Sequence, residues 1–330
     1  MITKRGLIAA GIGFGIRAAG AATTPPQETV LRLGYLASRS SQIGRGAAEL
    51  AGQVARLTDS RIRVEVYPNS QIGAEAELLQ AVAHGTVDMA FLTSAVLGSF
   101  VQPLGIFDIP FLFRDLAHAR AVMDGPIGQD ALAAFRARGV VGLAWGENGF
   151  RHLTTATRTV RSAADVKGLR IRVPQSEVML TAFRALGTDA QPLAFNELYG
   201  ALATGRFEAQ ENPISTITAA RFYAVQKHLS LTGHVYSPAV IVINGGVFDS
   251  IAPPDQAALR RAAQAGAKVS RTASEVADRN GVADLQSNGM QVIRNCDRAS
   301  FVVAMASAEP TFVKLFGQDR IAAVRNTKAG

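Results

Sequence analysis

The alternation of strand and helix patterns over residues 30–92 constrains the fold of this chain most. Residues 62–67 read Ile-Arg-Val-Glu-Val-Tyr, with apolar side chains at every second position, as in a strand with one buried face. Apolar residues in 44–57 recur at intervals of three and four, which is typical of an amphipathic helix. The same reasoning predicts strands at 30–36 and 87–92 and a helix at 74–83. This alternation predicts βαβ units, and hence a largely parallel sheet in an α/β fold.

A long Ala-rich amphipathic segment, 254–286, begins after Pro253 and ends before Asn288-Gly289. It predicts a helix roughly 45 Å long, enough to span a molecule of two domains. The length of 330 residues also favours two domains, and no repeat or low-complexity linker separates them, so we expect them to be intertwined. Further strands are predicted at 140–145, 169–173 and 238–243, and further helices at 178–186 and 196–203.

The N-terminus has the pattern of an export signal. Lys4 and Arg5 precede an apolar stretch at 7–16, and Ala-Gly-Ala at 19–21 offers a small-residue cleavage site. We therefore expect a cleavable signal peptide at 1–22 and a periplasmic mature protein. Removal of this segment takes away three basic residues and no acidic ones, so the net charge falls from +8 to +5. A moderate positive charge favours anionic ligands through the overall field.

The remaining composition argues against several classes of protein. The basic residues form no run of five or six, so we expect no nucleic-acid partner. A single cysteine, Cys296, excludes a disulfide within the chain. The five histidines lack the spacing of a metal site, and the chain has neither a Walker loop nor a Gly-x-Ser-x-Gly nucleophile motif. We therefore expect no metal, no cofactor and no enzymatic activity.

Three short segments carry the polar groups that a carboxylate-binding site needs. They are Gly-Phe-Arg at 149–151, Arg-Ile-Arg-Val-Pro at 170–174 and Gln-Glu-Asn-Pro at 210–213. A guanidinium presents two parallel N–H donors that match the two oxygens of a carboxylate, and an asparagine adds a donor without further charge. Each segment alone is more typical of surface arginines or a turn. Together they point to a site for an organic anion.

Eight motifs occur in the order found in one protein family. They are Val-Tyr-Pro at 66–68 with Gln-Ile-Gly at 71–73, Gly-Thr-Val-Asp-Met-Ala at 85–90, Phe-Asp-Ile-Pro-Phe-Leu-Phe at 107–113, Glu-Asn-Gly-Phe-Arg at 147–151, Lys-Gly-Leu-Arg-Ile-Arg-Val-Pro at 167–174, Phe-Asn-Glu-Leu-Tyr-Gly-Ala-Leu at 195–202, Gln-Glu-Asn-Pro at 210–213 and Val-Gln-Lys at 225–227. From about residue 31 to residue 316 the chain therefore resembles the periplasmic solute-binding subunit of tripartite ATP-independent periplasmic (TRAP) transporters, of the DctP type.

This resemblance implies a periplasmic binding protein fold of two α/β lobes, joined by crossing hinge strands and a long lobe-spanning helix. We expect lobe I to comprise 28–148 plus 237–276, and lobe II to comprise 149–236 plus 277–326. The family captures an organic acid between the lobes and delivers it to membrane permease subunits. Most members are monomers, so a monomer is expected here.

The resemblance also implies the main ligand contacts. Arg172 matches the arginine that forms the family's main salt bridge to the ligand carboxylate, and Arg151 matches a second carboxylate-contacting arginine. Asn212 matches the amide of the Gln-Glu-Asn-Pro segment. Phe195 matches an aromatic residue that packs against the ligand, although plain filling of the core is an alternative role.

Three further residues complete the expected site. Gln175 follows Pro174, at a place where the family varies residues around the ligand. Glu75 and Ser94 lie in segments of lobe I that usually face the cleft, and a purely structural role is equally open for both. Arg170 is interpreted as a solvent-facing residue on the strand of Arg172. The segment 39–42 has no family signature, so its contacts are left unassigned.

The expected mechanism depends on the two arginines. Their mutual repulsion in an open cleft disfavours closure, and a bridging carboxylate would cancel it and shift the population to the closed state. Amides at Asn148, Gln175 and Asn212 suggest a ligand with hydroxyl groups, so a sugar acid or a small dicarboxylate is expected.

One departure from the family pattern lies beside this site. Phe-Glu-Ala at 207–209 replaces the usual Val-Asp-Gly, which removes the φ freedom of glycine and lengthens an acidic side chain. Glu208 could contribute to the site or cap a helix. Two alternative functions also stay open: a ligand-sensing protein that signals to a membrane kinase, and a periplasmic enzyme acting on a carboxylate.

Overall fold

The computed structural model describes residues 28–329, so the expected export signal at 1–22 lies outside the described residues. The first elements are β1 (Thr29–Tyr35), α1 (Gln42–Leu57), β2 (Ile62–Tyr67), α2 (Glu75–Ala83) and β3 (Met89–Thr93). β1 lies between β2 and β3 and pairs in parallel with both. The βαβ units predicted from the sequence are therefore confirmed, with β3 beginning two residues later than expected.

The local sequence explains why α1 forms where it does. The side chain of Ser41 caps the helix by accepting a hydrogen bond from the backbone N–H of Gly44. Ile43, Ala47, Leu50 and Val54 follow at helical spacing and are fully buried. This face packs α1 against the sheet and against the long helix described below.

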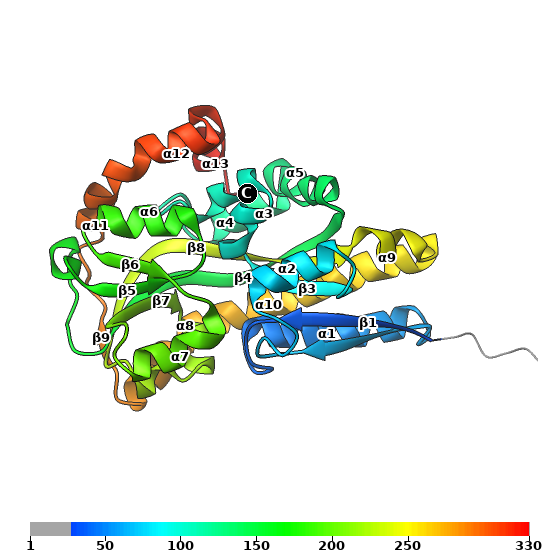
Figure 1. The fold of residues 1–330 in the computed structure, drawn as a ribbon, viewed down its shortest axis with the longest axis horizontal. Helices are drawn as coiled ribbons and strands as arrows, with labels where there is room; N and C mark the ends of the chain where they lie inside the picture. The colour runs from blue at the N-terminus through cyan, green and yellow to red at the C-terminus, as the bar shows by residue number, and fades with distance from the viewer. Residues whose placement is uncertain (1–27, 330) are drawn as a thin grey trace, which may run out of the picture.

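Two long strands, β4 (Val140–Thr155) and β8 (His228–Asn244), run antiparallel through the middle of the sheet (Figure 1). The later half of β8 pairs with β3, whereas the later half of β4 pairs with β7 (Ala209–Pro213). Both strands therefore pass from one section of the sheet into the other, as expected for crossing hinge strands. Their pairing shifts register between Glu147 and Gly149, and Gly149 has a φ of 120°, which side chains with a Cβ rarely adopt.

The second parallel section contains β5 (Arg170–Val173), which pairs with both β6 (Asp189–Pro192) and β7. The helices of this section are α6 (Glu177–Ala185), α7 (Phe195–Ala203) and α8 (Ile214–Ala219). The complete strand order is β2-β1-β3-β8-β4-β7-β5-β6, with β9 (Gln291–Ile293) beside β8. One continuous mixed sheet thus joins two parallel sections through β4 and β8.

The long helix α10 (Pro253–Ser287) contains 35 residues and confirms the predicted helix. At about 1.5 Å per residue it is roughly 50 Å long. It contacts α1, β4 and α8, and so touches both sections of the molecule (Figure 1). The backbones of α1 and α10 approach closely, because a Cβ added to Gly266 would lie 2.5 Å from the carbonyl oxygen of Gly46.

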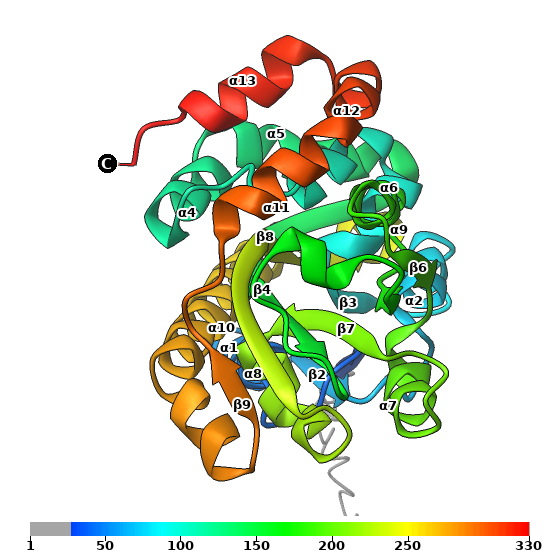
Figure 2. The same ribbon diagram turned by 90° about the vertical axis from the view of Figure 1, so that its left-hand side faces the viewer.

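Of the remaining helices, all but α9 lie along one side of the molecule, with α11–α13 beside α4, α5 and α6 (Figure 2), whereas α9 follows β8 at a separate end (Figure 1). They are α3 (Leu97–Phe100), α4 (Leu116–Asp124), α5 (Pro126–Ala134), α9 (Gly245–Ser250), α11 (Arg298–Met305), α12 (Glu309–Phe316) and α13 (Gln318–Asn326). Within 28–329, Arg298–Phe316 is the one helical stretch that could cross a membrane by length and composition. Its large side chains Phe301, Met305, Phe312 and Phe316 are nevertheless buried in the core.

Candidate functional site

A small cavity lies where β4, β5 and β7 meet the chain segments that follow β1 and β3. Counted together with the solvent space at its mouth, its volume is about 340 Å³. Phe195 and Pro174 form part of its apolar wall. Its polar lining consists of Glu75, Thr93, Asn148, Arg151, Arg172, Asn212 and Thr216. Five of the seven residues predicted for the ligand site therefore meet in one cavity at the junction of the two sheet sections.

Arg172, on β5, is a buried cation without an acidic partner. Only 3% of its surface is exposed. Its Nε and Nη2 both donate to the carbonyl oxygen of Leu193, at 2.8 and 2.6 Å, and it forms no ion pair with any acidic residue in the described part of the chain. Burial lowers the pKa of Arg172 to about 10, because a buried charge is poorly solvated. Such a charge is costly unless an anion balances it.

Arg151, on β4, is already paired inside the protein. Its Nε and Nη2 donate to the two carboxylate oxygens of Glu211, at 2.5 and 2.7 Å. His234 Nε2 lies 3.0 Å from the same carboxylate. Burial acts to raise the pKa of Glu211, but the charge and hydrogen bonds of Arg151, together with the His234 contact, bring it down to about 2. The charge of Arg151 still acts to lower the pKa of Arg172, as the expected repulsion requires, but Glu211 offsets it, so the two arginines are not both unpaired.

The two asparagines in the cavity wall are held by neighbouring side chains. Asn212 Nδ2 donates to Gln210 Oε1 at 2.6 Å, and Asn212 Oδ1 accepts from Arg151 Nη2 at 3.4 Å. Asn148 Oδ1 accepts from Gln42 Nε2 at 2.7 Å. Both amides are therefore oriented before any ligand enters.

Glu75, at the start of α2, is a buried carboxyl whose two oxygens are both bonded. The backbone N–H and the hydroxyl of Thr93 donate to them, at 2.7 and 3.0 Å. Burial raises the pKa of Glu75 to about 7, although these hydrogen bonds and the charges of Arg172 and Arg151 oppose the shift. Near neutral pH the group is therefore present in both its protonated and its ionised form.

Phe195 begins α7 and combines the two roles considered from the sequence. It lines the cavity, and its ring packs edge-on against Phe222 with a centroid distance of 6.0 Å and an interplanar angle of 63°. One surface of the ring is thus available to a ligand while another contributes to the core.

Two of the predicted residues do not line the cavity. Ser94 donates to Asp108 Oδ1 at 2.6 Å, and Ser176 donates to the other oxygen of Asp108 at 2.7 Å, so Ser94 serves to fix a buried carboxyl. Gln175 is exposed to solvent. The chain turns at Gln175, where the backbone N–H of Ser176 donates to the carbonyl oxygen of Pro174 at 2.7 Å, and Gln175 is not among the residues that line the cavity.

The residues that depart from the family pattern lie outside the cavity. Arg170 is exposed, as expected, and its Nε lies 3.2 Å from Glu208 Oε2. Glu208 is therefore committed to a surface ion pair and to the backbone N–H of Arg170. Ala209 is buried in β7 and has no positive φ, so the glycine of the family pattern is not needed for the backbone here.

Thr93, Thr216 and the partner of Arg151 were missed by the sequence analysis. The threonines lie in segments without a motif, so nothing local distinguishes them from core residues. Glu211 did carry a signal, since an acidic residue inside a buried strand motif must find a cation. Gln42, which holds Asn148, lies in the segment that was left unassigned.

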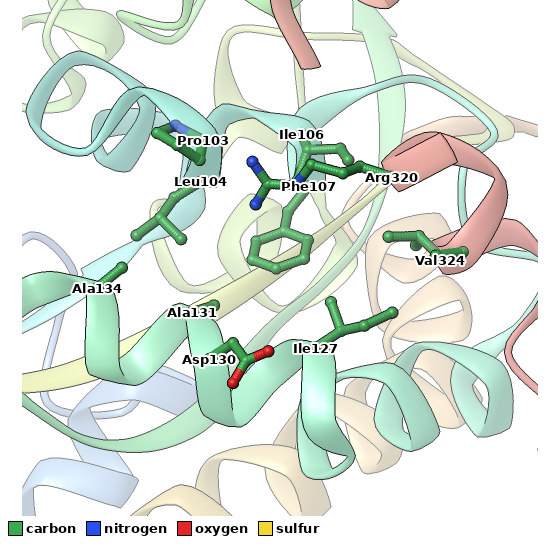
Figure 3. Close-up of a pocket in the computed structure, with 11 residues that line it drawn as sticks. Pro103, Leu104, Ile106, Phe107, Ile127, Asp130, Ala131, Ala134, Arg320 and Val324 are labelled. Carbon is green, nitrogen blue, oxygen red and sulfur yellow. The ribbon is translucent and has the colours of Figure 1, made fainter. Parts of the chain in front are cut away.

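A second cavity, between the 3-10 segment Gln102–Asp108, α5 and α13, differs in character (Figure 3). Apolar side chains dominate its lining, as Figure 3 shows for Leu104, Phe107, Ile127 and Val324. Its two charged residues, Asp130 and Arg320, have opposite signs. It therefore offers no excess positive charge to an organic anion.

Comparison with known proteins assigns the chain to a family. Residues 33–314 match the model of the bacterial extracellular solute-binding proteins, family 7 (DctP). A solute-binding protein of Verminephrobacter eiseniae is 42% identical over 305 residues, which cover 92% of this chain and 91% of that protein. The 2,3-diketo-L-gulonate-binding periplasmic protein of Escherichia coli is 34% identical over 285 residues, covering 86% and 87% respectively.

A solved structure gives the same result for the fold. A TRAP periplasmic solute-binding protein from Polaromonas sp. JS666, bound to D-erythronate, is 42% identical and superimposes with a TM-score of 0.90 over 92% of this chain and 100% of that one. The two-lobe fold is thereby confirmed. A family of substrate-binding proteins also supports the expectation that this chain is not an enzyme. The chain belongs to family 7 of the bacterial extracellular solute-binding proteins, the DctP family of TRAP transporters.

Proposed function

We propose that this chain captures a hydroxylated monocarboxylate, such as a sugar acid, between its two lobes and delivers it to membrane permease subunits. The observation that carries the proposal is Arg172, a buried guanidinium that lines the cavity and has no acidic partner in the part of the chain that the structure describes. A ligand carboxylate would supply the missing anion and accept two parallel N–H donors. The Nη1 atom of Arg151, which Glu211 leaves free, is the second donor available to it.

The charges in the cavity favour one carboxylate over two. Arg151 is balanced by Glu211, and Glu75 is neutral or negative, so at most one net positive charge is left for the ligand. A second carboxylate would find no further unpaired cation among the described residues that line the cavity. D-Erythronate and 2,3-diketo-L-gulonate, found with relatives of this chain, each carry one carboxylate and several oxygen functions.

The uncharged part of the ligand would meet polar groups from both lobes. Asn148, Asn212 and Thr216 can donate to and accept from hydroxyl groups, and the protonated form of Glu75 can donate as well. Phe195 offers an apolar surface to the carbon chain. This combination suits a sugar acid better than an acid with a purely hydrocarbon chain.

We further propose that the lobes are divided as expected from the sequence, 28–148 plus 237–276 and 149–236 plus 277–326. With this division Glu75 and Thr93 belong to lobe I, and Arg151 and Arg172 belong to lobe II. A ligand that contacts both lobes has a higher affinity for the closed state and therefore shifts the population towards it. The signal peptide 1–22 would be cleaved on export, which N-terminal sequencing of the exported protein can test. The mature protein would act as a monomer, which light scattering can test.

A thermal-shift screen of residues 23–330 against organic acids tests the proposal. An acid at 100 times its Kd stabilises by about 2.7 kcal/mol, which raises Tm by a few degrees. We expect the largest shifts with D-erythronate and longer sugar acids, a smaller one with succinate, and none in Arg172→Met. The absence of a shift with every carboxylate, or an equal shift in Arg172→Met, would contradict the proposal. A larger response to succinate than to any sugar acid would contradict the charge argument alone.

A further inference from the structure

Two glutamines outside the ligand cavity are joined to each other through a threonine. Gln210 belongs to the Gln-Glu-Asn-Pro motif and Gln226 to the Val-Gln-Lys motif, and neither lines the cavity. Gln210 Nε2 donates to Thr154 Oγ1 at 2.7 Å, and Thr154 Oγ1 donates to Gln226 Oε1 at 3.0 Å. All three residues are fully buried, with 0% of their surface exposed. Because buried polar groups are costly unless they are bonded, these contacts hold the three side chains in place.

The pairing of two strands brings this series of hydrogen bonds to the ligand cavity. Thr154 on β4 lies opposite Gln210 on β7, and Asn212 follows Gln210 by two residues, so Gln210 and Asn212 lie on one face of β7. Asn212 Nδ2 donates to Gln210 Oε1 at 2.6 Å, and Asn212 lines the cavity. We call the four side chains of Asn212, Gln210, Thr154 and Gln226 the amide chain.

The far end of the amide chain fixes the direction of its hydrogen bonds. Gln226 Nε2 donates to the backbone carbonyl oxygen of Val225 at 3.2 Å. A carbonyl oxygen can only accept, so Gln226 must turn Oε1 towards Thr154. The hydroxyl of Thr154 then donates to Gln226 and accepts from Nε2 of Gln210. Gln210 therefore turns Oε1 towards Asn212 and requires a donor there.

The near end of the amide chain requires the same direction. Arg151 Nη2 donates to Asn212 Oδ1 at 3.4 Å. A guanidinium can only donate, so Asn212 must turn Oδ1 towards Arg151 and Nδ2 towards Gln210. A flipped amide at Asn212 or Gln210 would set two donors or two acceptors against each other. Both ends therefore assign Asn212 one orientation.

This orientation decides what Asn212 offers to a ligand. Its Nδ2 carries two hydrogen atoms, and Gln210 accepts one of them. The other is left for an acceptor in the cavity, whereas Oδ1 is directed at Arg151. The role of Asn212 is thereby narrowed from donor or acceptor to donor. Such a donor suits a carboxylate, hydroxyl or keto oxygen of the ligand.

We propose that Gln210, Thr154 and Gln226 are positioning residues for the ligand site. They hold Asn212 with one N–H free for a ligand oxygen, although none of the three lines the cavity. The inference rests on the proposed function, because it takes the cavity beside Arg172 to be the ligand site.

Calorimetric titration with D-erythronate tests the proposal through the order of the expected losses. Gln210→Met removes the acceptor of Asn212 and should weaken the affinity about fivefold, the effect of one neutral hydrogen bond. Thr154→Val interrupts the amide chain one step further away, so we expect a smaller loss. Thr154→Ser keeps the hydroxyl and should bind like wild type.

Thr58→Val is the matched control for Thr154→Val. Thr58 is also 0% exposed, and its hydroxyl donates to the carbonyl oxygen of Val54 at 2.8 Å and accepts from the backbone N–H of Ile62 at 3.2 Å. It does not line the cavity. Thr58→Val should therefore lower stability in urea as Thr154→Val does, but leave the affinity unchanged. Equal losses of affinity in the two variants, or wild-type affinity in Gln210→Met, would overturn the proposal.

Neutron diffraction from deuterium-exchanged crystals of the ligand-free protein tests the amide chain without any ligand. We expect deuterium on the Gln210 atom that faces Thr154 and on the Asn212 atom that faces Gln210. Deuterium on the opposite atom of either amide would overturn the proposal. A wild-type protein that binds neither D-erythronate nor any longer sugar acid would instead contradict the proposed function.

Discussion

The two buried arginines on either side of β7 differ in whether an acidic residue of the protein pairs with them. Arg151 on β4 and Arg172 on β5 are 4% and 3% exposed. The carboxylate of Glu211 holds Arg151, whereas the hydrogen bonds of Arg172 within residues 28–329 both go to the backbone carbonyl of Leu193. Burial acts to lower the pKa of both, but Glu211 outweighs this for Arg151, so its pKa lies above the usual value.

The comparison distinguishes a contact that stabilises the folded protein from a side chain that is left for the ligand. The Arg151–Glu211 pair is complete without ligand, so it contributes to the folded state. Arg172 has no ion-pair partner among the described residues, so we infer that its partner comes from outside. Residue type and burial are alike for the two arginines, and the acid next to Arg151 distinguishes them.

The largest effect expected is on stability, in Arg151→Met. This change leaves the carboxylate of Glu211 buried without its cation, which should cost about 3–5 kcal/mol in the free energy of unfolding. Urea denaturation of the ligand-free protein measures it, with Arg170→Met, which breaks only the exposed pair with Glu208, as the control. Stability of Arg151→Met within about 1 kcal/mol of wild type would remove the distinction between the two arginines.

The second effect is on binding, in Arg172→Ala and Arg172→Lys. Loss of the partner of a buried carboxylate costs about 2–5 kcal/mol, so affinity should fall at least thirtyfold or so. We expect Arg172→Lys to restore little, because an ammonium cannot reproduce the fork of a guanidinium. Calorimetric titration measures the affinity of both variants for the ligand. Urea denaturation of the ligand-free variants should show no loss of stability relative to wild type. Binding by Arg172→Lys close to that of wild type would contradict the role given to Arg172.

A third effect is the pH dependence that Glu75 gives to the site. Its pKa is raised above the ordinary value of 4.5 to about 7, so its contribution to stability is complete below about pH 4.5 and is lost as the pH rises through 7. Ionised Glu75 also opposes an anionic ligand, so affinity should fall by up to about tenfold between about pH 6 and pH 8.

Glu75→Gln should remove this dependence of affinity on pH. The variant must be compared with wild type because Asp278, on α10, also has a pKa that burial raises to about 7. A pH profile that persists unchanged in Glu75→Gln would assign the effect to another group. Glu208→Gln, at the surface, serves as the control.

The smallest effect is expected in Gln175→Ala. Because Gln175 is exposed and does not line the cavity, its loss should change the affinity less than about twofold, as for other surface substitutions. A calorimetric loss of tenfold or more would show that Gln175 reaches the ligand and would support its prediction as a specificity residue.

The sequence predicted what depends on local pattern. Apolar periodicity is local, so it identified the first βαβ units and most of α10. Five of the seven predicted contacts line the cavity. In a motif with a proline or beside a strand, the local backbone determines where the side chains point. The failures are non-local. The pairing of Arg151 with Glu211 depends on the register between β4 and β7, sixty residues apart in the chain, which no single motif contains.

The same limit explains the other errors. Ser94 lies in a segment that reaches the site, but the position of Asp108 decides where its hydroxyl points. The C-terminal helices α11–α13 were not predicted, because their apolar faces are short and separated by turns. Their burial follows from contacts with distant parts of the chain.

A crystal structure with a bound sugar acid tests the central claim most directly. We predict that the two oxygens of the ligand carboxylate lie about 3 Å from guanidinium nitrogens, namely those of Arg172 and the Nη1 atom of Arg151. The Arg151–Glu211 pair should stay intact. A carboxylate bound away from Arg172, or one that displaces Glu211 from Arg151, would contradict this claim.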